Sequence, residues 1–148
     1  MQIFNTMTRQ KEEFTPQKEG EYRIYVCGPT VYNYIHIGNA RPMIVFDTLR
    51  RYLEYCGNKV YYVSNITDID DKLIKKGQEE GTSMQEVARK FEAEYIRDSD
   101  GLNVKAPTVR PRATEHIGEI IKIVKDLVES GHCLLYTSPS PRDRSLSR

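Results

Sequence analysis

The sequence predicts an α/β fold built around a parallel strand–helix–strand unit, and three observations lead to this prediction. Residues 22–27 form an unbroken run rich in β-branched and aromatic side chains that ends at Gly28-Pro29, which is typical of a buried parallel strand. Residues 39–56 repeat apolar side chains at helical spacing and stop before a glycine. Residues 59–64 are again strand-like. Strand, helix and strand in this order form a βαβ unit, so we expect the two strands to be parallel.

Three further helices are predicted after this unit. Asp70 or Asp71 can cap the first, and Ser83 with Glu86 forms a capping box that opens the second. Thr114 opens the third, which ends before a glycine. Apolar stripes on the last two helices are predicted to be core: Met84, Val87, Ala88, Phe91 and Tyr95 on one, and Ile117, Ile120, Ile121, Val124, Leu127 and Val128 on the other.

Composition limits the classes of protein that this chain can represent. The 148 residues suggest one domain, with 39% hydrophobic and 29% charged residues and a formal net charge of +1. No apolar run approaches the roughly 20 residues that span a bilayer, and residues 1–14 lack the apolar core of a secretory signal. Cys27, Cys56 and Cys133 form neither a disulfide framework nor a C-x-x-C pair. These features predict a reduced, cytoplasmic protein that is not associated with a membrane.

The composition and the apolar pattern of the sequence change at Cys133. Residues 133–148 contain two prolines, four serines and three arginines without any period. A basic RNA-binding tail and an ordinary disordered terminus are two interpretations of this composition. However, residues 133–143 resemble the in-frame translation of a transposon-based DNA-sequencing adapter. We therefore expect residues 133–148 to be a non-native, disordered tail.

The segment after the first strand is the strongest candidate for chemistry. In open parallel sheets, ligands bind beyond the carboxyl ends of the strands. Here a helix N-terminus follows directly and offers free N–H groups and a positive dipole end, which suit a phosphate. Gly38 allows a ligand to approach the backbone, and His36 and Asn39 are hydrogen-bond donors. The lack of a G-x-G-x-x-G or Walker lysine motif argues against a dinucleotide oxidoreductase and a P-loop enzyme.

The tetrapeptide His36-Ile37-Gly38-Asn39 resembles the His-Ile-Gly-His signature of class I aminoacyl-tRNA synthetases. Five further blocks are similar to the cysteinyl-tRNA synthetase family, and the similarity covers about residues 2–132. This resemblance implies a Rossmann-like nucleotide-binding fold, of which residues 1–132 would be the first half and the N-terminal part of the catalytic domain. The blocks are Phe4–Thr6, Thr8–Phe14, Tyr25–Tyr32, Asn65–Lys72 and Pro111–Ile117.

The resemblance also implies a reaction. Enzymes of this family join cysteine to ATP, with Mg²⁺, to give cysteinyl adenylate, and then transfer cysteine to the 3′ end of tRNA(Cys) in protein biosynthesis. By this similarity His36 and Asn39 are catalytic and stabilise charge on the α-phosphate. Pro29, Thr30 and Gly38 complete the ATP-binding signature. Asn39 replaces the second histidine of the signature and remains a neutral donor at every pH.

The same resemblance makes Cys27 a Zn²⁺ ligand and Thr67 a contact of the substrate cysteine. A soft metal selects sulfur over a hydroxyl, and coordination deprotonates the thiol. Zinc needs about four ligands, of which this chain supplies one. The residues alone also allow Cys27 to be a small buried hydrophobe and Thr67 a turn residue. His116 is expected on a helix surface, so we do not include it among the ligands.

Two alternatives stay open. The first is that the chain belongs to a related ligase, which joins cysteine to an amino sugar with the same cysteine-activating core. The second is that the fragment is a non-catalytic folding or binding module. The chain lacks the Lys-Met-Ser-Lys-Ser loop of the family and three zinc ligands. We therefore expect no cysteine-dependent ATP–pyrophosphate exchange from the 148-residue chain itself. No protein partner is predicted.

Overall fold

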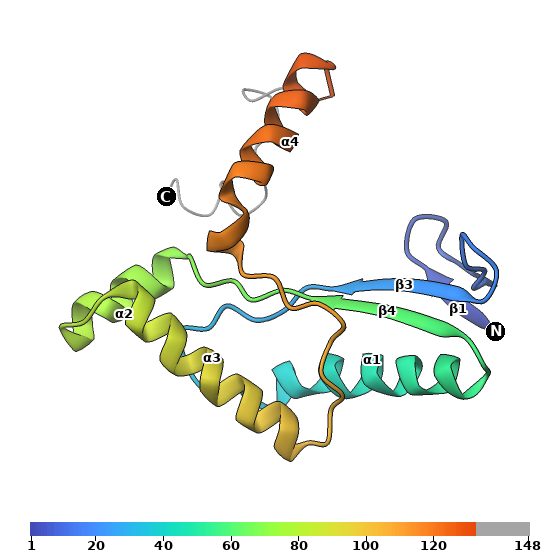
Figure 1. Ribbon diagram of the computed structural model, residues 1–148, viewed down its shortest axis with the longest axis horizontal. Helices are drawn as coiled ribbons and strands as arrows, with labels where there is room; N and C mark the ends of the chain where they lie inside the picture. Colours follow the sequence, from blue (N-terminus) through green and yellow to red (C-terminus); the bar gives the residue numbers. More distant parts are fainter. Residues whose placement is uncertain (133–148) are drawn as a thin grey trace. The chain divides into compact units, whose positions relative to one another are not determined.

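The computed structural model describes residues 1–132, which form a mixed α/β structure with four α-helices and a parallel sheet (Figure 1). The tail predicted for residues 133–148 lies outside the described residues. Contacts divide the chain into a unit over Met1–Ala113 and a second unit that begins at Thr114. In chain order the elements are β1 (Gln2–Asn5), β2 (Gln10–Glu13), β3 (Glu21–Val26), α1 (Ile37–Tyr55), β4 (Lys59–Ser64), α2 (Asp71–Glu80), α3 (Met84–Gly101), a 3₁₀ turn (Ala113–His116) and α4 (Ile117–Glu129).

The parallel βαβ unit is confirmed. Strands β3 and β4 pair in parallel, from Glu21 opposite Lys59 to Val26 opposite Ser64. Residues 108–112 run along the other edge of β4, since Val109 forms a parallel bridge with Val63. The sheet of the first unit is therefore wider than the two strands that its sequence pattern predicts.

Helix α1 covers one face of this sheet, as Figure 1 shows. Leu53 of α1 is buried against Val60 and Tyr62 of β4, and apolar side chains of β3 pack around them. On the opposite face Tyr25 is 64% exposed and Tyr61 is 41% exposed. The unbroken apolar run predicts a strand buried on both faces, but only one face of β3 is covered in this structure.

A second core lies between α2, α3 and the loops that follow the strands. The predicted stripe of α3 is confirmed, because four of its five residues are buried and Met84 packs against them. Asp70 caps α2 by accepting a hydrogen bond from the Lys72 N–H at 2.9 Å, and Gly81 ends the helix in the left-handed conformation that suits glycine. The core members are Val31, Ile66, Leu73, Val87, Ala88, Phe91 and Tyr95.

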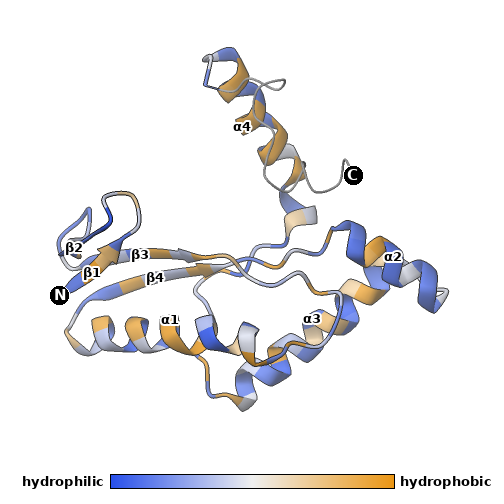
Figure 2. Ribbon diagram, turned by 180° about the vertical axis from the view of Figure 1, so that it is seen from behind, coloured by the Kyte–Doolittle hydropathy of each residue, from blue (hydrophilic) through white to orange (hydrophobic). Residues whose placement is uncertain are grey.

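Helix α4 differs from this pattern. Apolar residues recur along α4 (orange in Figure 2), yet no residue of this helix, which lies wholly within the described residues, is buried. Within the predicted stripe, the exposed fraction of the residues runs from 39% for Val128 to 50% for Ile121. The prediction that this stripe is core is therefore wrong for this structure. Periodicity identifies the face of a helix that avoids water, but it does not supply the surface that covers it.

The N-terminal hairpin is an element that the sequence does not predict. Strands β1 and β2 pair antiparallel, from Gln2 opposite Glu13 to Asn5 opposite Gln10. Their short sequences alternate only weakly between apolar and polar residues, so they carry little strand signal. In the described part of the chain, no helix combines the length and the apolar character needed to cross a membrane.

Candidate functional site

The carboxyl ends of β3 and β4 are joined by backbone hydrogen bonds beyond the strands themselves. The Thr67 N–H donates to the Pro29 carbonyl at 3.1 Å, and the Val31 N–H donates to the Thr67 carbonyl at 3.2 Å. Gly28 is required here, because a Cβ at this position would lie 1.7 Å from the Asn65 carbonyl oxygen. This pairing holds the predicted residue Thr67 beside the segment from Gly28 to Val31.

A capping box of neutral side chains opens helix α1. The Gly38 N–H donates to Nδ1 of His36 at 3.0 Å, and the His36 N–H donates to Oδ1 of Asn39 at 3.1 Å. The imidazole folds over Gly38, where a Cβ would lie only 2.6 Å from Cε1 of His36. The glycine of the signature is therefore needed so that His36 can cap the helix.

The cap also sets which polar atoms face outwards. Because Nδ1 of His36 accepts a hydrogen bond, the neutral ring carries its proton on Nε2. Asn39 uses its oxygen in the cap, so its amide N–H groups remain available. Nε2 of His36 and the side-chain amide nitrogen of Asn39 donate to no other described residue, and the first turn of α1 holds no acidic side chain. The helix N-terminus thus presents donors and a positive dipole end without a carboxylate.

A cavity of about 120 Å³ lies beside this cap. Four residues predicted for the site line it, namely Cys27, Pro29, Gly38 and Asn39. His36 lies on a different hollow, with Ala40 and Arg97, and Thr30 forms a bridge with Thr67 instead of lining the cavity. The structure therefore brings most of the predicted residues to one place, with His36 on the outer side of the helix N-terminus.

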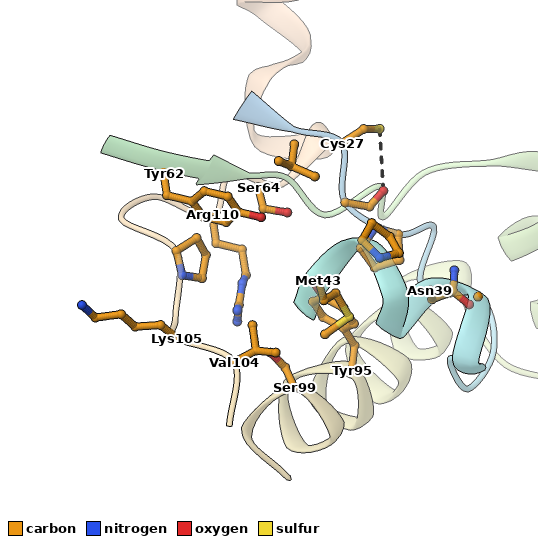
Figure 3. A pocket seen from close by; sticks show the side chains of 16 residues that line it. Cys27, Asn39, Met43, Tyr62, Ser64, Tyr95, Ser99, Val104, Lys105 and Arg110 are labelled. Atoms are coloured by element: carbon orange, nitrogen blue, oxygen red, sulfur yellow. Dashed lines mark hydrogen bonds between the residues drawn. The ribbon is translucent and has the colours of Figure 1, made fainter. Parts of the chain in front are cut away.

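Sequence reasoning missed several residues that line the same cavity, as Figure 3 shows. Ser64 is the last residue of β4, Tyr95 and Ser99 come from α3, and Arg110 comes from the segment that pairs with β4. Burial raises the pKa of Tyr95, while the Arg110 charge and a hydrogen bond with Ser64 act in the opposite direction. No local motif marks these residues, because three separate elements bring them together.

The thiol of Cys27 is exposed, with Sγ 3.7 Å from the Gly28 carbonyl oxygen. The interpretation of Cys27 as a small buried hydrophobe is therefore wrong. In the described part of the chain, no three His, Cys, Asp or Glu side chains lie close enough together to hold a metal ion. Cys27 alone cannot satisfy the four-coordinate geometry that zinc requires.

Comparison with known proteins now decides the family. The family model for the catalytic domain of class I tRNA synthetases (C) matches residues 13–142. The chain belongs to this family. Three curated relatives named cysteine–tRNA ligase, from Lachnoclostridium phytofermentans, Clostridioides difficile and Lachnospira eligens, are 58%, 58% and 57% identical over 132 residues. Each alignment covers 89% of this chain and 28% of the relative, so the chain spans little more than a quarter of the length of these proteins.

Proposed function

We propose that this chain, over residues 1–132, is the N-terminal part of the catalytic domain of a cytoplasmic cysteine–tRNA ligase with a Rossmann-like fold. The ligase would activate cysteine with ATP and then charge tRNA(Cys). The observation that carries the proposal is the position of the signature: His36-Ile37-Gly38-Asn39 forms the uncharged cap of α1, directly beside the cavity that Cys27 lines. A phosphate at this cap would lie close to a thiol-binding residue, as cysteine activation requires.

In the activation step, a carboxylate oxygen of cysteine attacks the α-phosphorus of ATP and pyrophosphate leaves. Negative charge grows on the oxygens of the α-phosphate as the new bond forms. Nε2–H of His36 and the Asn39 amide would donate to these oxygens at the positive end of α1, and the cap holds both side chains in place beforehand. Pro29, Thr30 and Gly38 would shape the backbone around ATP, which enters as its Mg²⁺ complex.

The thiol of the substrate would be recognised at Cys27, with Thr67 as a neighbouring contact. The exposed Cys27 thiol suits Zn²⁺, which would select sulfur over the hydroxyl of serine. Since Cys27 is the one metal-binding side chain that the described residues offer at this site, the other zinc ligands would come from outside residues 1–132. The alternative ligase for an amino sugar is favoured by no observation, and the relatives compared above are named cysteine–tRNA ligase.

A chimeric enzyme tests this proposal. Residues 1–132 of this chain would replace the aligned 132 residues of the Lachnoclostridium phytofermentans relative. We expect cysteine-dependent ATP–pyrophosphate exchange within about tenfold of the parent enzyme, a change of barrier near 1.4 kcal/mol, together with charging of tRNA(Cys). Serine in place of cysteine serves as the substrate control. A folded chimera whose exchange does not depend on cysteine would contradict the proposal.

The Cys27→Ser variant of the chimera tests the role of the thiol. We expect the rate of cysteine-dependent exchange to fall by at least about 100-fold, because changes even to outer-shell partners of a metal cost 10–100-fold. Cys56→Ser is the matched control, since Cys56 is also an exposed, free cysteine but lies at the far end of α1. Equal exchange by the two variants would remove Cys27 from the site.

A further inference from the structure

Arg110 is a partly exposed arginine that lines the cavity beside the cap of α1 and leaves one guanidinium nitrogen without a hydrogen-bond acceptor in the described part of the chain. Its Nε atom is buried and has no partner, and its guanidinium carbon lies 5.7 Å from the centroid of the Tyr95 ring. A buried donor that makes no hydrogen bond costs free energy, and the cost is larger for a charged group. Native structures rarely keep such a donor unless water or a ligand satisfies it.

Neighbouring arginines show that this fold supplies acceptors elsewhere. Arg50 donates to Glu54 at 3.0 Å and to the Ala106 carbonyl at 2.6 Å, while its guanidinium lies over Tyr62 much as that of Arg110 lies over Tyr95. Arg112, two residues beyond Arg110, pairs with the buried carboxylate of Glu92 at 2.9 Å. The Nε atoms of Arg50 and Arg112 both donate to a carboxylate, whereas Nε of Arg110 has no partner.

The surroundings of Arg110 are suited to an anion. The cavity that it lines contains the buried hydroxyl residues Ser64 and Ser99, and none of its lining residues is acidic. Lys105 also lines the cavity, but its ammonium pairs with Glu54 at 2.6 Å and points away in Figure 3, whereas the Arg110 side chain extends into the space between β4 and α3. The positive charge inside the cavity thus comes from Arg110.

We propose that this cavity is an oxyanion-binding site in which Arg110 holds a single carboxylate or phosphate group. The planar guanidinium can donate two parallel hydrogen bonds to such a group, and the low local dielectric strengthens them. A cavity of about 120 Å³ far exceeds the roughly 10–15 Å³ that one water molecule needs, so it has room for a small anionic group. The site shares its cavity with Cys27 and Asn39, and it adds Arg110, which the proposed function does not use.

Thermal unfolding of the 148-residue chain tests the proposal. Inorganic phosphate and acetate would be added separately at constant ionic strength, with chloride as the reference anion, and unfolding would be followed by circular dichroism. Since a ligand that binds the folded state raises its stability, we expect at least one anion to raise Tm by about 3 °C or more. The response to each anion shows whether the site takes phosphate, a carboxylate or both.

Arg110→Met is the variant that should lose this response. Because it removes a buried donor that has no partner, we expect it to fold at least as stably as the wild type without added anion. The matched control is Arg97→Gln, which removes an exposed arginine of α3 that pairs with Glu94. General salt effects on Tm would appear in all three proteins. An equal rise in wild type and Arg110→Met, or no rise with either anion, would overturn the proposal.

A second measurement covers the case in which unfolding is poorly cooperative. The ¹⁵N resonance of Arg110 Nε–H, assigned by its loss in Arg110→Lys, reports directly on the buried donor. Titration with the same two anions should move this resonance in a saturable way while the exposed Arg97 signal stays in place. A resonance that does not respond to either anion would overturn the proposal as well.

Discussion

Helices α1 and α3 begin with the same local device, a reciprocal capping box, but the two boxes differ in charge. In α3, Glu86 N–H donates to the Ser83 hydroxyl at 3.2 Å, and the Glu86 carboxylate accepts from the Ser83 N–H at 3.0 Å. In α1 both members of the box, His36 and Asn39, are neutral when the imidazole is unprotonated. In both helices the cap side chain accepts from a backbone N–H of the first turn, that of Gly38 in α1 and that of Glu86 in α3.

The difference shows which helix end is left available for a ligand. The first turns of α2, α3 and α4 each contain an acidic residue, Asp71, Glu86 and Glu119, whereas that of α1 contains none among the four described α-helices. A carboxylate stabilises the positive end of the helix dipole but repels a phosphate. The cap of α1 contains no such group, so the positive end of this helix remains suited to a phosphate.

Among changes to the two caps, replacing His36 should have the largest effect on the rate of ATP–pyrophosphate exchange. We expect His36→Ala in the chimera to lower ATP–pyrophosphate exchange by about 10²–10³-fold, the usual cost of one donor to a developing oxyanion. Helix stability should fall by about 1 kcal/mol, because the cap is lost. His36→Asn keeps a capping side chain without the ring, so it should recover the stability and leave exchange low. Full exchange by His36→Asn would mean that His36 is only a cap.

The cap of α3 should matter for stability alone. Ser83→Ala removes the hydroxyl that accepts from the Glu86 N–H, so we expect the free energy of unfolding to fall by about 1 kcal/mol. Urea denaturation of the chimera measures this change. Exchange should stay at the level of the unsubstituted chimera, and a tenfold loss would show that the α3 terminus also belongs to the site.

The smallest effect is a pH dependence confined to the α3 box. Hydrogen bonds from the Thr82 hydroxyl, the Ser83 N–H and the Ser83 hydroxyl lower the pKa of Glu86 to about 2, from an ordinary value of 4.5. A lowered pKa in the folded state gives a stability that is complete above about pH 4.5 and is lost as the pH falls towards 2. Urea midpoints between pH 5 and pH 2 should therefore fall less steeply for Glu86→Gln. Identical slopes would assign the acid dependence to other groups.

Features set by neighbouring residues could be predicted from the sequence. The two strands, the Asp70 cap of α2 and the capping box of α3 depend on side chains within a few positions of each other, and the structure confirms them. Arg110 could not be predicted in this way, because its cavity forms only when β4, α3 and the segment after α3 come together. The exposure of the α4 stripe could not be predicted either, since an apolar stripe does not reveal whether anything covers it.

The placement of Cys27, Pro29, Gly38 and Asn39 around one cavity follows from the parallel pairing and the helix that starts beside it. The exposure of the Cys27 thiol was not evident from the sequence, because a cysteine at a strand end is more often buried. What each residue binds stays a prediction that the chimera tests.

The most direct test of the uncharged cap is the Asn39→Glu variant of the chimera, which gives α1 the carboxylate that α3 already has. The new side chain can still accept from the His36 N–H, and its charge favours the helix dipole by about 0.3–1 kcal/mol, so the variant should be at least as stable. Like charges brought together cost several kcal/mol, so we predict that cysteine-dependent exchange falls at least about 100-fold. Asn39→His, which restores the usual signature, should keep its exchange. A stable Asn39→Glu variant that exchanges as fast as Asn39→His would contradict the account.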